Sequence, residues 1–268
     1  MPVARKLSNT IKIHPITGTP VFALVGIMRL EYTSLRLCEM SNLKRNGKLR
    51  WAPSFLRNRG QMTRGQKRAL RTWWPDYGIT FQHDEVIDLD SHFLHDGPLL
   101  IEIGFGMGDH LVHLARSLPE YRVLGIEVHR PGLAAATQKI HDLKLSNVRI
   151  MRGDARLILT DHLKESAAQA VIIQFPDPWP DQGDAHRRLV QEGMADVIRR
   201  HLSDSGELLI VTDVSEYADH CRAILDQSAH WKSSHPSQYH AHRVRTLYEQ
   251  KAIKGGREVT ELSYQVVD

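Results

Sequence analysis

Short apolar runs alternate with amphipathic stretches from residue 99 onward, and this alternation predicts the core of the protein. Runs rich in Leu, Ile and Val have the length of buried strands and cover 99–103, 122–127, 147–152, 170–175 and 207–211. Apolar residues with helical spacing follow in the segments 109–118, 131–145, 187–202 and 215–228. Strands that alternate with helices in this way indicate a parallel sheet covered on both faces.

The last part of the chain breaks this alternation. It supplies strand-like segments near 230–234 and 259–267, which we expect to form an antiparallel hairpin at one edge. The predicted fold is therefore an α/β fold. It has a mostly parallel, seven-stranded, Rossmann-like sheet with helices on both faces and an antiparallel C-terminal edge hairpin.

The first hundred residues are less regular. Residues 1–50 show no convincing period and predict a poorly ordered extension, of which 1–39 precede a more ordinary start at Met40. Residues 51–97 form a second segment, with a short helix capped by Thr63 and ended at Trp74 by the following proline. A short strand is expected near 85–89, and the sheet domain is expected to span 98–268.

The overall composition excludes several classes of protein. The chain has 268 residues, of which 41% are hydrophobic and 25% charged, as in a globular protein with a full core. Its two cysteines, Cys38 and Cys221, lie far apart, which predicts reduced thiols and excludes a cysteine-based zinc site or a disulfide framework. With no apolar run long enough to span a bilayer, we expect a cytoplasmic protein without membrane or metal partners.

The charge is more informative in its distribution than in its total of +4. No carboxylate occurs between Met40 and Asp76, whereas ten basic residues do, namely Lys44, Arg45, Lys48, Arg50, Arg57, Arg59, Arg64, Lys67, Arg68 and Arg71. Aromatic residues such as Trp51, Phe55 and Trp73 are interleaved with them. This composition suits a polyanion such as RNA, and a solvated basic tail is the alternative.

A glycine-rich turn follows the first predicted strand. Gly104, Gly106 and Gly108 stand at alternate positions, and a helical pattern begins at Asp109. Strand, glycine turn and helix together are typical of a nucleotide-type cofactor site, because backbone without Cβ atoms can approach a ligand closely. Glu102 lies inside the apolar run, where an unpaired carboxylate is costly, and this favours a cationic or donor-rich ligand. The pattern alone is equally consistent with a turn that binds nothing.

Acidic residues end the five predicted parallel strands: Glu102, Glu127, Asp154, Asp177 and Asp213. The acid after the second strand suits ribose hydroxyls, and the acid after the third can accept from an adenine amino group. Both NAD and S-adenosyl-L-methionine satisfy this pattern. The G-x-G-x-G spacing and the negative charge of Glu102 disfavour a pyrophosphate, so the sulfonium cofactor is preferred.

Six motifs carry a resemblance to a known family. They are Ser54–Gln66, Glu102–Gly108, Gly125–His129, the box Phe175-Pro176-Asp177-Pro178-Trp179, Thr212-Asp213 and Thr246-Leu247-Tyr248-Glu249. In these motifs, from about Ser54 to the C-terminus, the chain resembles the bacterial tRNA (guanine-N7-)-methyltransferases, the TrmB family of class I methyltransferases. The Phe-Pro-Asp-Pro-Trp box is the most specific of the six.

The resemblance implies an enzyme that transfers a methyl group from S-adenosyl-L-methionine to guanine N7 in the variable loop of tRNA. It implies cofactor contacts at Glu102, Gly104, Gly106, Gly108, Glu127, Asp154 and Asp177. Asp177 would also be the catalytic residue, as a positioner rather than a general base, since N7 carries no proton. The implied substrate-binding residues are Asp213, Thr246, Leu247, Tyr248 and Glu249. The partner is tRNA, no metal is implied, and a monomer and a homodimer are both open.

Two departures from the family pattern bear on the substrate. Asp181 stands where a lysine of a basic cluster is expected, so only Arg187 and Arg188 keep the basic character of that segment. Val244 stands where proline is usual. A carboxylate facing a phosphate is unfavourable. A divergent methyltransferase acting on another RNA or purine, and a non-catalytic RNA-binding module, are therefore the alternatives.

Overall fold

A single sheet organises the part of the chain that the structure describes. The computed structural model describes residues 53–55, 61–235, 239 and 242–267, all of them within the unit Trp51–Asp268. The predicted extension over residues 1–50, with Cys38, lies outside the described residues. The strands are β1 Gly78–Ile79, β2 Leu99–Ile103, β3 Arg122–Glu127, β4 Val148–Arg152, β5 Ala168–Gln174, β6 Leu202–Thr212, β7 Trp231–Ser233 and β8 Thr260–Val266.

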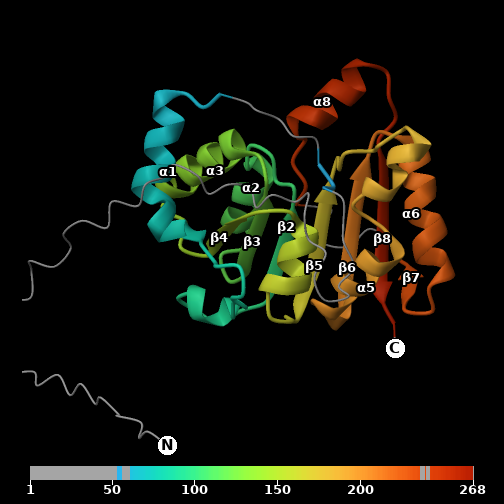
Figure 1. The fold of residues 1–268 in the computed structure, drawn as a ribbon, viewed down its shortest axis with the longest axis horizontal. Helices are drawn as coiled ribbons and strands as arrows, with labels where there is room; N and C mark the ends of the chain where they lie inside the picture. The colour runs from blue at the N-terminus through green and yellow to red at the C-terminus, as the bar shows by residue number, and fades with distance from the viewer. Residues whose placement is uncertain (1–52, 56–60, 236–238, 240–241, 268) are drawn as a thin grey trace, which may run out of the picture. The chain divides into compact units, whose positions relative to one another are not determined.

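The strand order is β1-β4-β3-β2-β5-β6-β8-β7 (Figure 1). The strands from β1 through β6 pair in parallel, and β8 runs antiparallel to both β6 and β7. The predicted parallel sheet and its antiparallel C-terminal hairpin are therefore confirmed. The seven strands predicted from residue 99 onward are present, and the two-residue strand β1 adds an eighth at the edge beside β4.

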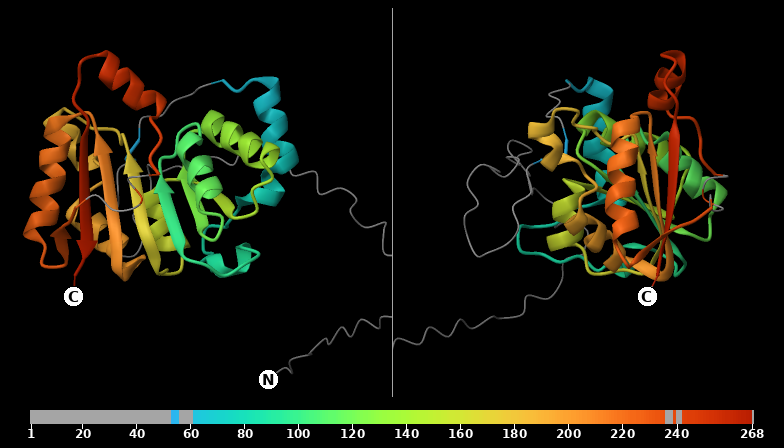
Figure 2. Two further views of the ribbon diagram at one scale, coloured as in Figure 1. Left: turned by 180° about the vertical axis from the view of Figure 1, so that it is seen from behind. Right: turned by 90° about the vertical axis from the view of Figure 1, so that its right-hand side faces the viewer.

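Helices cover both faces of the sheet, as Figure 2 shows in its edge-on view. Their bounds are α1 Arg64–Tyr77, α2 Asp109–Ser117, α3 Arg130–Asp142, α4 Ala155–Leu157, α5 Glu192–Arg200, α6 Ser215–Gln227 and α8 Leu247–Lys254. Short 3-10 helices cover Leu89–His92 and Gln182–Arg187, and a π-helical turn covers Ile158–His162. No helix in the described residues is long and apolar enough to cross a membrane.

The core is double-sided because side chains alternate along each buried strand. On one face Val123 and Ile150 pack with residues of α1, α2 and α3, and on the other Leu124 and Val171 pack with residues of α4, α5 and α6. All five residues of β2 are buried. Because helices cover both faces of the sheet, successive side chains on both sides of a central strand are buried. This explains why the central strands are nearly continuous apolar runs in the sequence.

The helix α1 differs from its prediction at the C-terminal end. Thr63 caps it in a capping box with Gln66, as expected, but the helix continues past Pro75 to Tyr77. A proline in the last turn removes one hydrogen bond only. The Gly78 N–H donates to the Trp74 carbonyl, and the Trp74 indole donates to Thr80 Oγ1 at 2.9 Å, so the last turn is held by other contacts.

Two other predicted elements also differ. The expected strand at 85–89 is reduced to a single bridge between Ile87 and Leu163. The helix expected over 187–202 begins only at Glu192, because Arg188 has extended backbone and its guanidinium is bound to the preceding loop. The motif from Thr246 to Glu249 lies at the start of α8, with Thr246 as its N-cap.

Candidate cofactor and active site

The carboxyl ends of five parallel strands lie side by side along one edge of the sheet. Since β4, β3, β2, β5 and β6 are neighbours in that order, the acids that follow them share this edge. The helix α8 and the segment Pro53–Phe55 lie at the same end of the sheet (Figure 1). The sequence predicted an acid at the end of each of these strands, and the observed strand order places the five acids along one edge.

The glycine turn after β2 has left-handed backbone at all three glycines, with φ of 75° at Gly104, 56° at Gly106 and 78° at Gly108. Side chains rarely adopt this conformation. A Cβ at Gly104 or Gly106 would meet nothing within 4 Å, whereas one at Gly108 would lie 2.6 Å from the Ala136 Cβ. Gly108 therefore allows α2 and α3 to pack closely, and the first two glycines leave open space for a ligand.

Glu102 presents a carboxylate oxygen that has no hydrogen-bond partner among the described residues. The residue is 2% exposed, its Oε1 lies 3.1 Å from His110 Nδ1, and its Oε2 is buried without a hydrogen bond. A buried polar atom of this kind costs free energy unless a donor reaches it. His110 is not among the site residues expected from the sequence, although its imidazole lies beside Glu102.

Glu127 is bound by backbone of the glycine turn and of its own strand end. Its Oε2 accepts from Gly106 N at 2.8 Å, and its Oε1 accepts from Val128 N at 2.6 Å and from His129 N at 2.8 Å. Burial raises the pKa of Glu127 above its ordinary value, the backbone N–H groups oppose this shift, and the charge of Glu102 adds to it. Two carboxylate oxygens offer about four acceptor sites, so one remains for a ligand hydroxyl.

Asp154 caps the short helix α4 and receives a segment from far away in the chain. Its Oδ1 accepts from Arg156 N at 3.1 Å and from Ser54 Oγ at 3.2 Å, and its Oδ2 accepts from Ser54 N at 3.4 Å. The Arg156 Nε lies 3.6 Å from Oδ1. Burial lowers the pKa of the fully buried Arg156, and Asp154 opposes that shift. The sequence contained no signal for the contact with Ser54.

Asp177 lies half-buried in the loop after β5, between two prolines. The aromatic residues at either end of the box have positive φ, 50° at Phe175 and 44° at Trp179. For large side chains this conformation costs about 1–3 kcal/mol each and persists only where the surroundings impose it. Backbone strain on both sides of one acid is the pattern found at functional loops.

The Arg188 side chain stabilises this loop conformation through hydrogen bonds to the loop backbone. Its Nε donates to the Pro178 carbonyl at 3.0 Å, and its Nη2 donates to the Trp179 carbonyl at 3.3 Å and to Glu216 Oε1 at 2.6 Å. At the other end of the loop, Phe175 N donates to the Val211 carbonyl at 2.7 Å. The loop is thereby held by both β6 and α6.

The predicted substrate-binding residues sit around α8 and the end of β6, and several have partners within the protein. Asp213 Oδ2 accepts from Arg257 Nε at 2.7 Å. Thr246 Oγ1 accepts from Glu249 N at 3.2 Å as the helix cap, and Glu249 Oε2 pairs with Arg243 Nη2 at 2.7 Å.

The two remaining residues of that motif are exposed. Leu247 and Tyr248 face outward at the start of α8, and the Tyr248 ring lies nearly parallel to that of Phe175, with centroids 6.5 Å apart. This contact joins α8 to the loop of Asp177. Binding of substrate by Asp213 and by the motif at the start of α8 remains a prediction.

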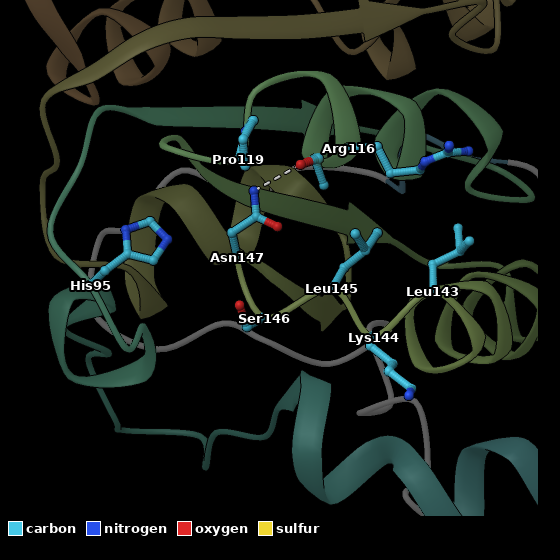
Figure 3. A pocket seen from close by; sticks show the side chains of 9 residues that line it. His95, Arg116, Pro119, Leu143, Lys144, Leu145, Ser146 and Asn147 are labelled. Atoms are coloured by element: carbon cyan, nitrogen blue, oxygen red, sulfur yellow. Dashed lines mark hydrogen bonds between the residues drawn. The ribbon is translucent and has the colours of Figure 1, made fainter.

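A separate cavity of about 320 Å³ lies at the opposite end of the sheet, beside the start of β4. Figure 3 shows His95, Arg116, Lys144 and Asn147 around it. The Asn147 amide donates to the Ala115 carbonyl at 3.0 Å, which holds the connection before β4. None of the five strand-end acids lines this cavity, so it is not part of the site described above.

Together the sheet order, the glycine turn and the strand-end acids define a class I methyltransferase. The profile of a family described as "Putative methyltransferase" matches residues 96–262. A crystal structure of the 16S rRNA methyltransferase KamB has the same fold, with a TM-score of 0.50 and 13% sequence identity. The match covers 69% of this chain and 95% of that one.

Two relatives show to which family of methyltransferases the chain belongs. The chain is 35% identical to a tRNA (guanine-N(7)-)-methyltransferase of Alkalilimnicola ehrlichii over 216 residues, 79% of this chain and 91% of that protein. It is also 35% identical to the enzyme of that name from Escherichia coli K12 over 227 residues, 83% of this chain and 95% of that protein. The chain belongs to the TrmB family of tRNA (guanine-N7-)-methyltransferases.

Proposed function

We propose that this protein transfers a methyl group from S-adenosyl-L-methionine to N7 of a guanosine in the variable loop of tRNA. The observation that carries the proposal is the buried Glu102 Oε2 without a partner, beside the open glycine turn and on the same sheet edge as the strained loop of Asp177. A protein with this function would act in the cytoplasm, where we expect it.

The residues at this edge fit the cofactor. The buried Glu102 Oε2 would accept from its amino group, and the open backbone at Gly104 and Gly106 would allow its amino-acid part to approach closely. Glu127 would accept from a ribose hydroxyl, and Asp154 would accept from the adenine amino group. S-adenosyl-L-methionine, when bound, supplies the activated methyl group. The protein supplies position and charge.

Guanine N7 has an in-plane lone pair and no proton, so the reaction requires alignment rather than a general base. Carboxylates at this edge would accept from guanine N1–H and from its exocyclic amino group, leaving N7 free toward the methyl group. Asp177 is the residue we assign to this task, with Asp213 as a further contact. Their negative charge also offsets the positive charge that the methylated ring acquires.

The helix α1 would contribute the contact with the RNA backbone. It has no acid in its first turn, and its exposed side includes Arg64, Lys67, Arg68 and Arg71, while Ala69 and Leu70 are buried. Such a one-sided basic helix suits phosphates, whose neutralisation releases counterions and makes binding dependent on salt.

The test is transfer of a labelled methyl group into unmodified tRNA, with the product nucleoside identified by mass spectrometry. We expect 7-methylguanosine. At saturating cofactor and tRNA, Asp177→Asn should lower kcat by roughly 100-fold, since it removes the charge and one acceptor while keeping the shape. Recovery of another nucleoside, or an unchanged kcat in the variant, would contradict the proposal.

A second candidate is methylation of another RNA, and the exposed Asp181 favours it. It stands in the segment where the family resemblance predicts a basic side chain, and it would repel a phosphate there. The same assay with unmodified ribosomal RNA separates the two candidates. Transfer into ribosomal RNA with none into tRNA would support the second candidate.

A further inference from the structure

The two arginines that remain in the segment after the Phe-Pro-Asp-Pro-Trp box point into the protein. From the sequence, Arg187 and Arg188 are the basic residues left for docking RNA at this segment. In the structure, their side chains are 23% and 7% exposed. Arg188 binds the loop of Asp177 and Glu216 through its Nε and Nη2, as described above. The contacts of Arg187 are of a different kind.

Arg187 binds a segment more than a hundred residues earlier in the chain. Its Nε donates to the Pro53 carbonyl at 3.0 Å, and its Nη2 donates to the Phe55 carbonyl at 3.4 Å. The guanidinium carbon lies 3.5 Å from the centroid of the Trp179 ring, and Nη1 lies 3.6 Å from Asp184 Oδ1. One planar group therefore joins the early segment to the end of the box.

Ser54, between Pro53 and Phe55, connects this segment to both Trp179 and Asp154. The Ser54 carbonyl accepts from Trp179 Nε1 at 3.1 Å, and Ser54 Oγ donates to Asp154 Oδ1 at 3.2 Å. Pro53–Phe55 thus spans from the acid after β4 to the loop after β5, beside the upper end of β5 in Figure 1.

We propose that Arg187 is a positioning residue for methyl transfer and not a ligand of RNA phosphate. It holds Pro53–Phe55 against Trp179 and thereby fixes the distance between Asp154 and the loop of Asp177. Asp154 is on the side assigned to the cofactor, and Asp177 is on the side assigned to the guanosine. This inference rests on the proposed function. It adds a residue that affects the reaction only by positioning Pro53–Phe55 and Trp179.

The planar guanidinium is required for this arrangement. It stacks on the indole and donates in two directions in one plane, which the single ammonium of lysine cannot reproduce. Its hydrogen-bond acceptors are two neutral carbonyls, and the Asp184 carboxylate lies 3.6 Å from its Nη1. A phosphate ligand, in contrast, is replaced by lysine with little loss, because the attraction depends mainly on charge.

The experiment compares Arg187→Lys and Arg187→Ala in steady-state methyl transfer into tRNA at several salt concentrations. We expect kcat to fall at least 10-fold in both variants, with no rescue by lysine. The KM for tRNA and its dependence on salt should stay within about twofold of wild type. Arg68→Ala on the exposed side of α1 calibrates the salt dependence of a phosphate contact. Arg222→Ala, which removes an exposed pair with Asp219, should leave kcat unchanged.

Three outcomes are decisive. If lysine restores kcat, or if Arg187→Ala changes the salt dependence as Arg68→Ala does, Arg187 is a phosphate ligand and the inference is overturned. If Arg187→Ala does not fold, Trp179→Phe is the second variant, which keeps an aromatic ring for the guanidinium and removes the indole N–H that donates to Ser54. A fall in kcat with constant KM for tRNA then supports the inference, whereas an unchanged kcat overturns it. If wild type transfers no methyl group to tRNA, the proposed function itself has failed.

Discussion

At the scale of single residues, the site is marked by polar atoms whose partners are incomplete. Glu127 has three backbone donors, whereas Glu102 Oε2 is buried without one. Both are carboxylates at strand ends in the same glycine-rich site. The difference between them identifies Glu102 as the residue that gains most from a ligand with a positive charge or several donors.

Replacement of Glu102 by Gln tests this directly. A hydrogen bond to a charged group contributes about 1.5–3 kcal/mol, so the affinity for S-adenosyl-L-methionine measured by calorimetry should fall roughly 10- to 150-fold. Because the change replaces a buried carboxylate that has one oxygen without a partner, the melting temperature of the ligand-free protein should not fall. Glu120→Gln, at an exposed position, is the matched control.

The opposite combination would contradict this assignment. A lower melting temperature with unchanged cofactor affinity would mean that Glu102 serves only as the partner of His110, whose Nδ1 lies 3.1 Å away.

At the scale of elements, the loop after β5 and the helix α8 depend on each other. The loop keeps a strained backbone because Arg188 and Val211 bind its ends, and α8 contacts it through the stack of Tyr248 on Phe175. The start of α8 is fixed by the Thr246 cap, and its buried Glu249 is held by Arg243. Burial lowers the pKa of Arg243, and Glu249 opposes this shift.

The cap predicts the effect of a substitution at Thr246. Loss of an N-cap hydroxyl costs about 1 kcal/mol, so Thr246→Ala should lower the free energy of unfolding by that amount in denaturant titrations. Thr246→Ser keeps the acceptor for Glu249 N and should restore the stability. If the alanine variant keeps its stability but loses affinity for tRNA, the hydroxyl contacts the substrate instead of capping the helix.

At the scale of the whole molecule, helices cover both faces of the sheet, and some polar side chains at the ends of strands are therefore buried. His201, at the start of β6, is 1% exposed, and its Nε2 lies 2.8 Å from the Leu159 carbonyl. Burial lowers its pKa below the ordinary value of 6.5, an effect that the carbonyl contact opposes. The folded protein therefore binds this proton less readily than the unfolded chain.

The sign of the resulting pH dependence follows from linkage. The stability contributed by neutral His201 is complete above pH 6.5 and is lost as the pH falls from 6.5 toward the folded-state pKa. The loss reaches at most about 1.4 kcal/mol per pH unit for one proton. Free energies of unfolding measured between pH 7.5 and 5 should therefore decrease less steeply in His201→Gln. Parallel curves for the two proteins would show that His201 carries no part of the acid sensitivity.

Much of the fold and part of the site follow from local patterns. The buried strands, the glycine turn and the acids at the strand ends are contiguous in the chain, so periodicity and turn chemistry reveal them. The errors fall where a distant group decides a local conformation. The helix expected from 187 begins later because Arg188 is bound to Pro178 and Glu216, and α1 passes Pro75 because Trp74 and Thr80 hold its last turn.

By itself the sequence determined the parallel sheet, the family and the set of acids, because each depends on residues close together in the chain. Only the tertiary structure decided that one oxygen of Glu102 is buried without a partner among the described residues. It also decided that Ser54 binds Asp154 and that Arg187 binds the segment Pro53–Phe55. Those contacts join residues about a hundred or more positions apart. Their formation depends on the burial and strand order of the whole sheet, which no short stretch of sequence encodes.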